Sequence, residues 1–223
     1  MRKVIKLISF CVVCTGLVLM TSCLNTAKSD DGKNAEAGLM EKKQLAPIGE
    51  FEEFNVLEDW DENPFVCFKG QGLLLAVGTP EHNNAMTIGW GSLGNIWSKI
   101  GPATVSVYVA EARYTFEFME KYDYFTVMAF AEEDARILNY MGTHSGREGD
   151  KAAQLGLHTL YTENGTPYYA EATWVLECKT IYRAPFLKEG MAEEPQQFYA
   201  NFSSGVHHMY LGNVVKALKR KTI

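Results

Sequence analysis

Asn84-Ala85-Met86-Thr87-Ile88-Gly89-Trp90-Gly91-Ser92 is a short strand-like stretch that runs into a glycine-rich turn. Residues 84–90 are predicted to form a β-strand, and two glycines bracket Trp90. Glycine lets the backbone approach a flat ligand closely, and its amide can donate to the carbonyls and ring nitrogens of that ligand. A strand that ends in a turn and buries a tryptophan in the core has the same pattern. Taken alone, the stretch leaves both interpretations open.

A second cluster follows the clearest strand of the chain. Residues 104–109 alternate between two faces with period two and are predicted to be a strand. Thr115 to Lys121 then has helical spacing, with Thr115 at the N-cap position. A guanidinium (Arg113), a hydroxyl (Thr115) and the free amides of a helix start make a natural phosphate site. A plain threonine cap with a solvated arginine is the alternative.

A third cluster is the polar stretch 143–151, Thr-His-Ser-Gly-Arg-Glu-Gly-Asp-Lys. It combines two hydroxyls, two glycines, an arginine and a lysine ahead of another predicted helix, which suits an anion. The position of the lysine excludes a P-loop. A polar loop before a capped helix is again the alternative.

The remaining segments predict a mainly β, α+β domain without internal repeats. Asn164-Gly165 predicts a tight hairpin turn between residues 160–161 and 168–169. Helices are expected at 132–140 and at 150–155, the second ended by Gly156. Further strands are expected at 72–78, 124–130, 173–182 and 207–215. Antiparallel strands with a few short helices between them favour a closed or half-closed barrel. Such a barrel has a small interior, so a ligand is expected in a surface groove or between two subunits.

The N-terminus is typical of an exported bacterial lipoprotein. Arg2, Lys3 and Lys6 precede an apolar run over 7–20 that is too short for a comfortable membrane span but right for a secretory signal. Ser22 then Cys23 match the site at which a lipoprotein is cleaved and lipidated. We therefore expect a signal peptide over 1–22, a flexible tether over 23–47 and a folded domain over 48–223. A signal anchor or a plain secretory signal is the alternative.

Composition excludes several classes of protein. The net charge of −6, without a basic stripe, argues against a nucleic-acid partner. The histidines and cysteines show no metal-site spacing, and neither GxSxG nor HExxH is present. After export the domain keeps Cys67 and Cys178, which form either one disulfide or two buried free thiols.

The three clusters, in this order and at these separations, resemble the flavin reductase-like, or flavoredoxin, family. That family has an (N)xMTIxW segment, an R-Y-T helix start and an S-G-R-[DE]-x-D-K loop. The closing residues 207–214, His-His-Met-Tyr-Leu-Gly-Asn-Val, resemble its last strand. The resemblance covers about residues 64–215, which is nearly the whole predicted domain.

The resemblance implies a six-stranded antiparallel split β-barrel of Greek-key type, usually a homodimer, with FMN near the subunit interface. Residues implied to border the flavin ring are Thr87, Ile88, Gly89, Trp90 and Gly91. Arg113 and Thr115 are implied near the phosphate. Four further residues are implied to add to the same anion environment or to reach it from the partner subunit: Ser145, Gly146, Arg147 and Lys151. His207 is implied on the nicotinamide side as the one catalytic candidate. Many relatives have an aspartate before this histidine, where this chain has Val206.

Two functions of different classes follow from the resemblance. One is an NAD(P)H-dependent flavin or ferric reductase that moves electrons through bound FMN. The other is a non-enzymatic exported flavin carrier or electron-transfer protein fed by a membrane partner. The export signal is a difficulty for the first, because reduced nicotinamide cofactors are cytoplasmic and an exported lipoprotein would not normally meet them. A split-barrel binding protein that has lost its flavin is a third possibility.

Overall fold

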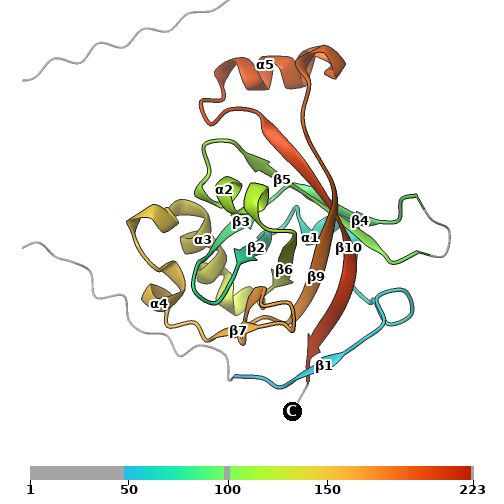
Figure 1. Ribbon diagram of the computed structural model, residues 1–223, viewed down its shortest axis with the longest axis vertical. Coiled ribbons are helices and arrows are strands. Elements are labelled where there is room, and N and C mark those ends of the chain that lie inside the picture. The colour runs from blue at the N-terminus through green and yellow to red at the C-terminus, as the bar shows by residue number, and fades with distance from the viewer. Residues whose placement is uncertain (1–47, 98–100, 222–223) are drawn as a thin grey trace, which may run out of the picture. The chain divides into compact units, whose positions relative to one another are not determined.

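The computed structural model describes residues 48–97 and 101–221, which belong to one compact unit (Figure 1). The predicted signal peptide, the tether and Cys23 lie outside the described residues. Within the described part of the chain, no helix is long and apolar enough to cross a bilayer.

An antiparallel sheet of eight strands forms the body of the fold. Its strands follow one another in space in the order β3-β2-β6-β9-β10-β5-β4, and β1 pairs with the far end of β10. The bounds are β1 (Phe51–Glu53), β2 (Leu73–Gly78), β3 (Asn83–Ile88), β4 (Gly91–Gly94), β5 (Thr104–Ala110), β6 (Tyr124–Ala129), β9 (Trp174–Pro185) and β10 (His207–Arg220). A separate hairpin pairs β7 (Thr159–Tyr161) with β8 (Pro167–Tyr169), as Asn164-Gly165 predicts.

The chain itself requires this sheet to curl into a barrel. β3 and β4 lie at opposite ends of the strand order, yet only Gly89 and Trp90 separate them in the sequence. The two ends of the sheet must therefore approach each other at this turn. Register shifts in the β9–β10 pair, at Leu211/Gly212 and Val214/Lys216, supply the bends that such curvature needs.

The predicted fold class is confirmed, but the predicted count of six strands is wrong. The sheet gains β1 and β4, which have three and four residues and are too short to show a period-two pattern. The strand expected over 84–90 also ends earlier, at Ile88, because the chain turns at Gly89 and Trp90.

The described residues also form five α-helices and three 3-10 turns, which lie between the strands in the sequence. The helices are α1 (Pro64–Cys67), α2 (Tyr114–Lys121), α3 (Ala135–Thr143), α4 (Lys151–Leu155) and α5 (Glu193–Asn201), and the turns are η1 (Glu132–Asp134), η2 (Gly146–Glu148) and η3 (Lys188–Gly190). The helix expected over 132–140 starts as η1 and continues as α3 to Thr143. The stop predicted at Gly156 is confirmed, since Gly156 has φ of +72°.

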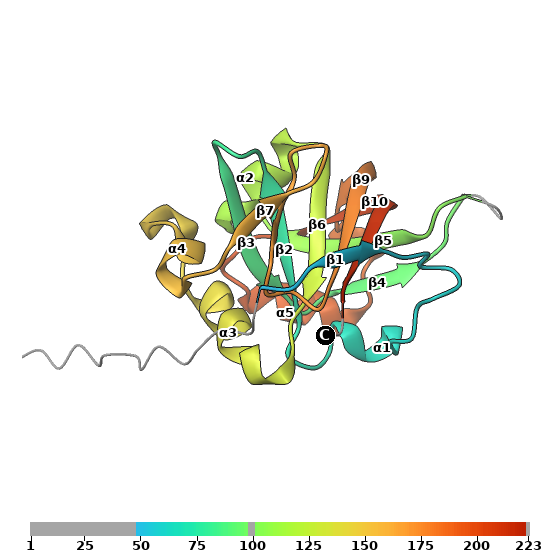
Figure 2. The same ribbon diagram turned by 90° about the horizontal axis from the view of Figure 1, so that it is seen from below.

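Two apolar cores bury both faces of the central strands. Leu75, Val107, Phe125 and Tyr210 are among the residues that fill the barrel interior. On the other face of β2, Leu74 packs with residues of α3 and β8. Figure 2 shows α3 and α4 beside β2 and β3. A filled barrel leaves no interior room for a cofactor, so a ligand site must lie on the outside.

The two cysteines of the described domain are free thiols, which decides between the alternatives left open by the sequence. Cys178 lies on β9 inside the barrel core, while Cys67 is half-buried at the end of α1. Burial raises the pKa of both thiols.

Candidate functional site

The start of α2 is built as an open helix terminus. Arg113 is the N-cap residue in extended conformation, and no side chain caps the helix. The first amides of a helix have no partner within the helix, so they remain available to an anion. The predicted N-cap role of Thr115 is wrong: Thr115 is the second helical residue and only 1% exposed. Its hydroxyl instead accepts a hydrogen bond of 2.7 Å from Asn84 Nδ2, which ties the helix start to β3.

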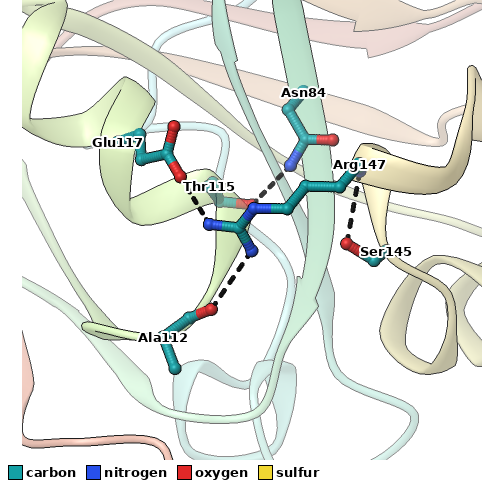
Figure 3. A network of polar contacts seen from close by, with 6 residues as sticks. All are labelled: Asn84, Ala112, Thr115, Glu117, Ser145 and Arg147. Atoms are coloured by element: carbon teal, nitrogen blue, oxygen red, sulfur yellow. Dashed lines mark hydrogen bonds and ion pairs between the residues drawn. The ribbon is translucent and has the colours of Figure 1, made fainter.

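The loop before α4 closes over this helix start (Figure 3). Arg147 makes an ion pair with Glu117, donates to the Ala112 carbonyl at 3.4 Å and lies over the Tyr114 ring, 4.8 Å from its centroid. Ser145 Oγ accepts from the Arg147 amide at 3.2 Å. The charge of Arg147 is therefore already balanced by a carboxylate of the protein.

Gly146 fits against β3 only because it lacks a side chain. A Cβ at this position would lie 2.0 Å from Asn84 Oδ1, far inside contact distance. Asn84 thus joins the η2 turn, β3 and the start of α2. Asn84 belongs to the first sequence cluster, but the spacing of residues within that cluster does not reveal this junction.

Lys151 is a buried cation at the first position of α4, with 5% of its surface exposed. Its ammonium donates to the carbonyls of Met141, at 2.9 Å, and His144, at 3.1 Å, both at the C-terminal end of α3. Burial lowers the pKa of Lys151 to about 8. Lys151 therefore stabilises the fold, because its positive charge lies at the negative, C-terminal end of α3.

These elements enclose a polar cleft of about 220 Å³. The second and third sequence clusters therefore converge, because the cleft is lined by Arg113, Thr115, Ser145, Gly146, Arg147 and Lys151. The three cations differ in availability. Arg147 is paired with Glu117 and Lys151 with two carbonyls, whereas no group within 48–97 and 101–221 hydrogen-bonds the exposed guanidinium of Arg113. Arg113 is thus the best placed of the three for an external anion.

A second hollow of about 250 Å³ lies at the turn between β3 and β4. Four of the residues implied to border a flavin ring line it: Thr87, Ile88, Gly89 and Trp90. The Thr87 hydroxyl, however, turns away to donate to the Leu138 carbonyl at 2.5 Å. We call it the ring slot. It shares Met86 and Arg113 with the polar cleft, so the two spaces adjoin.

Gly91 does not line the ring slot. It begins β4 and borders a neighbouring hollow of about 480 Å³. A Cβ on Gly91 would lie 2.2 Å from the Phe68 ring, so the glycine here serves close packing against an aromatic side chain.

His207 lies in the ring slot inside an aromatic stack. Its ring is 4.3 Å from that of Trp90 and 5.2 Å from that of Phe202, both nearly parallel to it. Nδ1 is hydrogen-bonded to the Tyr199 hydroxyl at 2.9 Å. Burial, and then the charge of Arg113, lower the pKa of His207, so the imidazole is neutral near pH 7. Tyr199 and Phe202 were missed by sequence analysis; their one signal is the aromatic run over 198–202.

Comparison with known proteins identifies the fold family. The protein-family model described as "Flavin reductase like domain" matches residues 67–221 of this chain.

The chain belongs to the flavin reductase-like family.

Solved structures agree with this fold at low sequence identity. A flavoredoxin from Methanosarcina acetivorans matches with a TM-score of 0.53 and 23% identity, over 67% of this chain and 68% of that chain. The FMN-binding domain of a flavin reductase-like enzyme from Shewanella baltica OS155 matches with a TM-score of 0.52 and 14% identity, over 77% of this chain and 78% of that chain. The flavoredoxin of Desulfovibrio vulgaris (Miyazaki F) matches with a TM-score of 0.51 and 20% identity, over 67% of this chain and 68% of that chain. No curated protein sequence matches the chain.

Membership of the flavin reductase-like family supports a flavin cofactor and a redox role, and the residues present fit such a group. A phosphorylated flavin has an anionic end and a flat ring. The polar cleft offers an unpaired guanidinium and free helix-start amides, while the ring slot offers a glycine backbone and aromatic walls. Because the two spaces adjoin at Arg113, one molecule of this shape can occupy both.

Proposed function

We propose that this chain is a flavoprotein that binds FMN and transfers electrons through it. The observation that carries the proposal is the junction at Arg113, where a cleft suited to an anion adjoins a slot suited to a flat ring. FMN has a single terminal phosphate, which matches a cleft with one unpaired cation and the open amides of one helix. The FMN-binding domain from Shewanella baltica, with the same fold, supports this choice.

In this proposal each group of residues has a distinct task. Arg113 and the amides that start α2 hold the phosphate, while Asn84, Gly146 and Arg147 fix the shape of the cleft. Backbone groups of Ile88 and Gly89 border the ring. FMN, when bound, supplies the hydride and single-electron chemistry. The protein needs no catalytic acid–base pair for that chemistry, and the ring slot contains a neutral histidine rather than such a pair.

As the reaction we propose NAD(P)H-dependent reduction of free flavin or ferric iron. Its test is anaerobic stopped-flow mixing of the FMN-loaded protein with NADH and, separately, with NADPH. Rapid bleaching of the oxidised flavin absorbance by either nucleotide, saturating with nucleotide concentration, is the expected result. Loss of the band with dithionite but with neither nucleotide would contradict this reaction while leaving FMN binding intact.

A second candidate is an electron-transfer protein that receives its electrons from a membrane partner. The environment of His207 favours it, since the histidine is already stacked on two aromatic rings and bonded to Tyr199. A histidine held in this way has no free ring nitrogen at Nδ1 for a nicotinamide. In the same stopped-flow experiment this candidate predicts no reduction by nucleotides but full reduction by a chemical donor.

Cofactor identity is tested directly on the purified protein. We expect a yellow protein whose released flavin co-migrates with FMN rather than FAD or riboflavin in liquid chromatography. A colourless protein that binds none of the three flavins in titration would contradict the proposal and favour a split barrel that has lost its flavin.

A further inference from the structure

A large apolar hollow lies beside the ring slot, outside the features used so far. It has a volume of about 690 Å³ and lies between the η3–α5 segment and the end of β9. Figure 1 shows α5 standing at the end of the β9–β10 pair. Small-molecule sites in proteins typically measure about 300–1,000 Å³ and are lined mostly by apolar and aromatic side chains. We call this space the α5 hollow.

The walls of the α5 hollow are apolar and leave large side chains uncovered. Phe186, Leu187 and Phe198 line it, and Leu187 is 66% exposed. Among its lining residues, all of which lie in the described part of the chain, only Glu194 is charged. A ligand with phosphate groups would meet that carboxylate and no cation, whereas an uncharged ring compound would meet matching apolar surface.

Trp90 connects the α5 hollow to the ring slot. Its side chain lines both spaces and is 42% exposed, and Phe198, 5.6 Å away between ring centroids, also lines both. A planar molecule in the α5 hollow therefore lies against the same tryptophan that borders the ring slot. Aromatic side chains in this arrangement favour flat partners, because offset or edge-to-face contacts add to the burial of area.

From this geometry we infer that the α5 hollow binds an uncharged, planar, apolar ring compound as the second ligand of the site. The assignment rests on the proposed function, since it places this ligand against the tryptophan that borders the proposed flavin slot. It excludes the nicotinamide nucleotides as occupants of the α5 hollow itself, because they bring phosphates to an acidic, otherwise apolar lining.

The test uses duroquinone, which is planar, uncharged and fully substituted, so that it does not alkylate thiols such as Cys67. Isothermal titration into the FMN-loaded protein should show one duroquinone bound per chain. Leu187→Glu places a second carboxylate in the hollow and should weaken this binding roughly tenfold or more. Leu57→Glu is the matched control, because Leu57 is equally exposed at 68% and does not line the hollow. It should leave duroquinone binding unchanged.

FMN affinity is measured in the same samples, which separates the two claims. Normal FMN binding without duroquinone binding overturns this inference alone. Absent FMN binding overturns the proposed function, while duroquinone titration of the flavin-free protein still tests the hollow. Equal losses in both leucine variants would overturn the assignment of the site. A second outcome would also overturn it: Leu187→Glu dissociates a dimer but leaves duroquinone binding unchanged. The hollow would then be a contact between two copies of the chain.

Discussion

At the scale of single residues, the anion affinity of the polar cleft depends on which cation has no hydrogen-bond partner among the described residues. Arg113, Arg147 and Lys151 all line it, yet Arg147 is held by Glu117 and Lys151 by two backbone carbonyls. An anion at either of these would compete for charge and donors with a partner that the fold already uses, which costs part of the binding free energy. Arg113 carries no such cost, so its contribution to ligand binding should exceed its contribution to stability.

Replacing Arg113 by alanine should weaken FMN binding about ten- to a hundredfold. A hydrogen bond between charged groups is worth roughly 1.5–3 kcal/mol, and about 1.4 kcal/mol corresponds to tenfold in affinity. Riboflavin lacks the phosphate and should lose far less. Quenching of flavin fluorescence on titration measures both affinities, and Lys188→Ala serves as a control for removal of an exposed positive charge outside the cleft. Equal losses for FMN and riboflavin would give Arg113 a structural role and move the phosphate contact to Ser145, Arg147 and Lys151.

Lys151 should give the stability of the protein a distinct pH dependence. Its pKa is about 8 in the folded protein against an ordinary value of 10.5. Between these values the unfolded chain binds more protons than the folded one, so the free energy of unfolding contributed by this residue rises with pH. Below about pH 8 both states are protonated and the contribution is constant. Urea unfolding of the wild type and of Lys151→Met across pH 7–10.5 should show the difference widening in favour of the wild type above pH 8; a constant difference would mean an ordinary pKa.

At the scale of secondary structure elements, β10 is the strand that allows the sheet to bend. It pairs with β9, β5 and β1 over its 14 residues, and its register against β9 shifts at Gly212. A Cβ on Gly212 would lie 2.8 Å from Cys178 Cβ and 2.9 Å from the Phe125 ring. β10 can therefore pack against the barrel core here only because residue 212 has no side chain.

Gly212→Ala should lower the free energy of unfolding by about 1–3 kcal/mol, because it overpacks a filled core. Gly94→Ala, on β4, is the matched control, since a Cβ there meets nothing within 4 Å. The control should unfold at the same denaturant concentration as the wild type or slightly higher. Chemical denaturation followed by circular dichroism compares the two, and equal stability of both variants would show that the core yields easily around β10.

At the scale of the whole molecule, we propose that the domain assembles as a homodimer. The barrel interior is filled by side chains, and large apolar groups such as Phe65, 87% exposed, and Trp97, 69% exposed, lie on the surface. Exposed apolar surface of this kind is typical of an interaction site. Sedimentation velocity of the FMN-loaded protein should show a species of twice the chain mass. A monomer that retains FMN would contradict a site shared between subunits.

We also propose that the protein is exported and held at a membrane of the cell envelope through a lipid on Cys23. The physical reason is the order of a basic start, an apolar run and a cysteine ahead of a polar tether. Cys23→Ala should move the protein from the detergent phase to the aqueous phase in Triton X-114 partitioning of cell extracts. A variant that stays in the detergent phase would show that the apolar run itself is the anchor.

Several features of the fold could be derived from the sequence because their signals are local. Period-two alternation located β5, Asn164-Gly165 located the β7–β8 hairpin, and Gly156 located the end of α4. These signals depend on residues within a few positions of one another, where backbone preferences and the pattern of burial act directly. Signals of the same local kind predicted the six longer strands of the sheet and the helices α2, α3 and α4, whereas α1 and α5 were not expected.

The tertiary structure decided the features that depend on contacts between distant residues. Thr115 has the sequence position of a helix cap, but the packing of Asn84 from β3 makes it a buried hydrogen-bond acceptor. Arg113 and Arg147 are alike in the sequence, and the contacts of Arg147 with Glu117, the Ala112 carbonyl and the Tyr114 ring make them different. The sequence determined which residues are available for an anion and a flat ring, through local pattern and composition. The fold decided which of them remain free, because burial and pairing are set by neighbours that are distant along the chain.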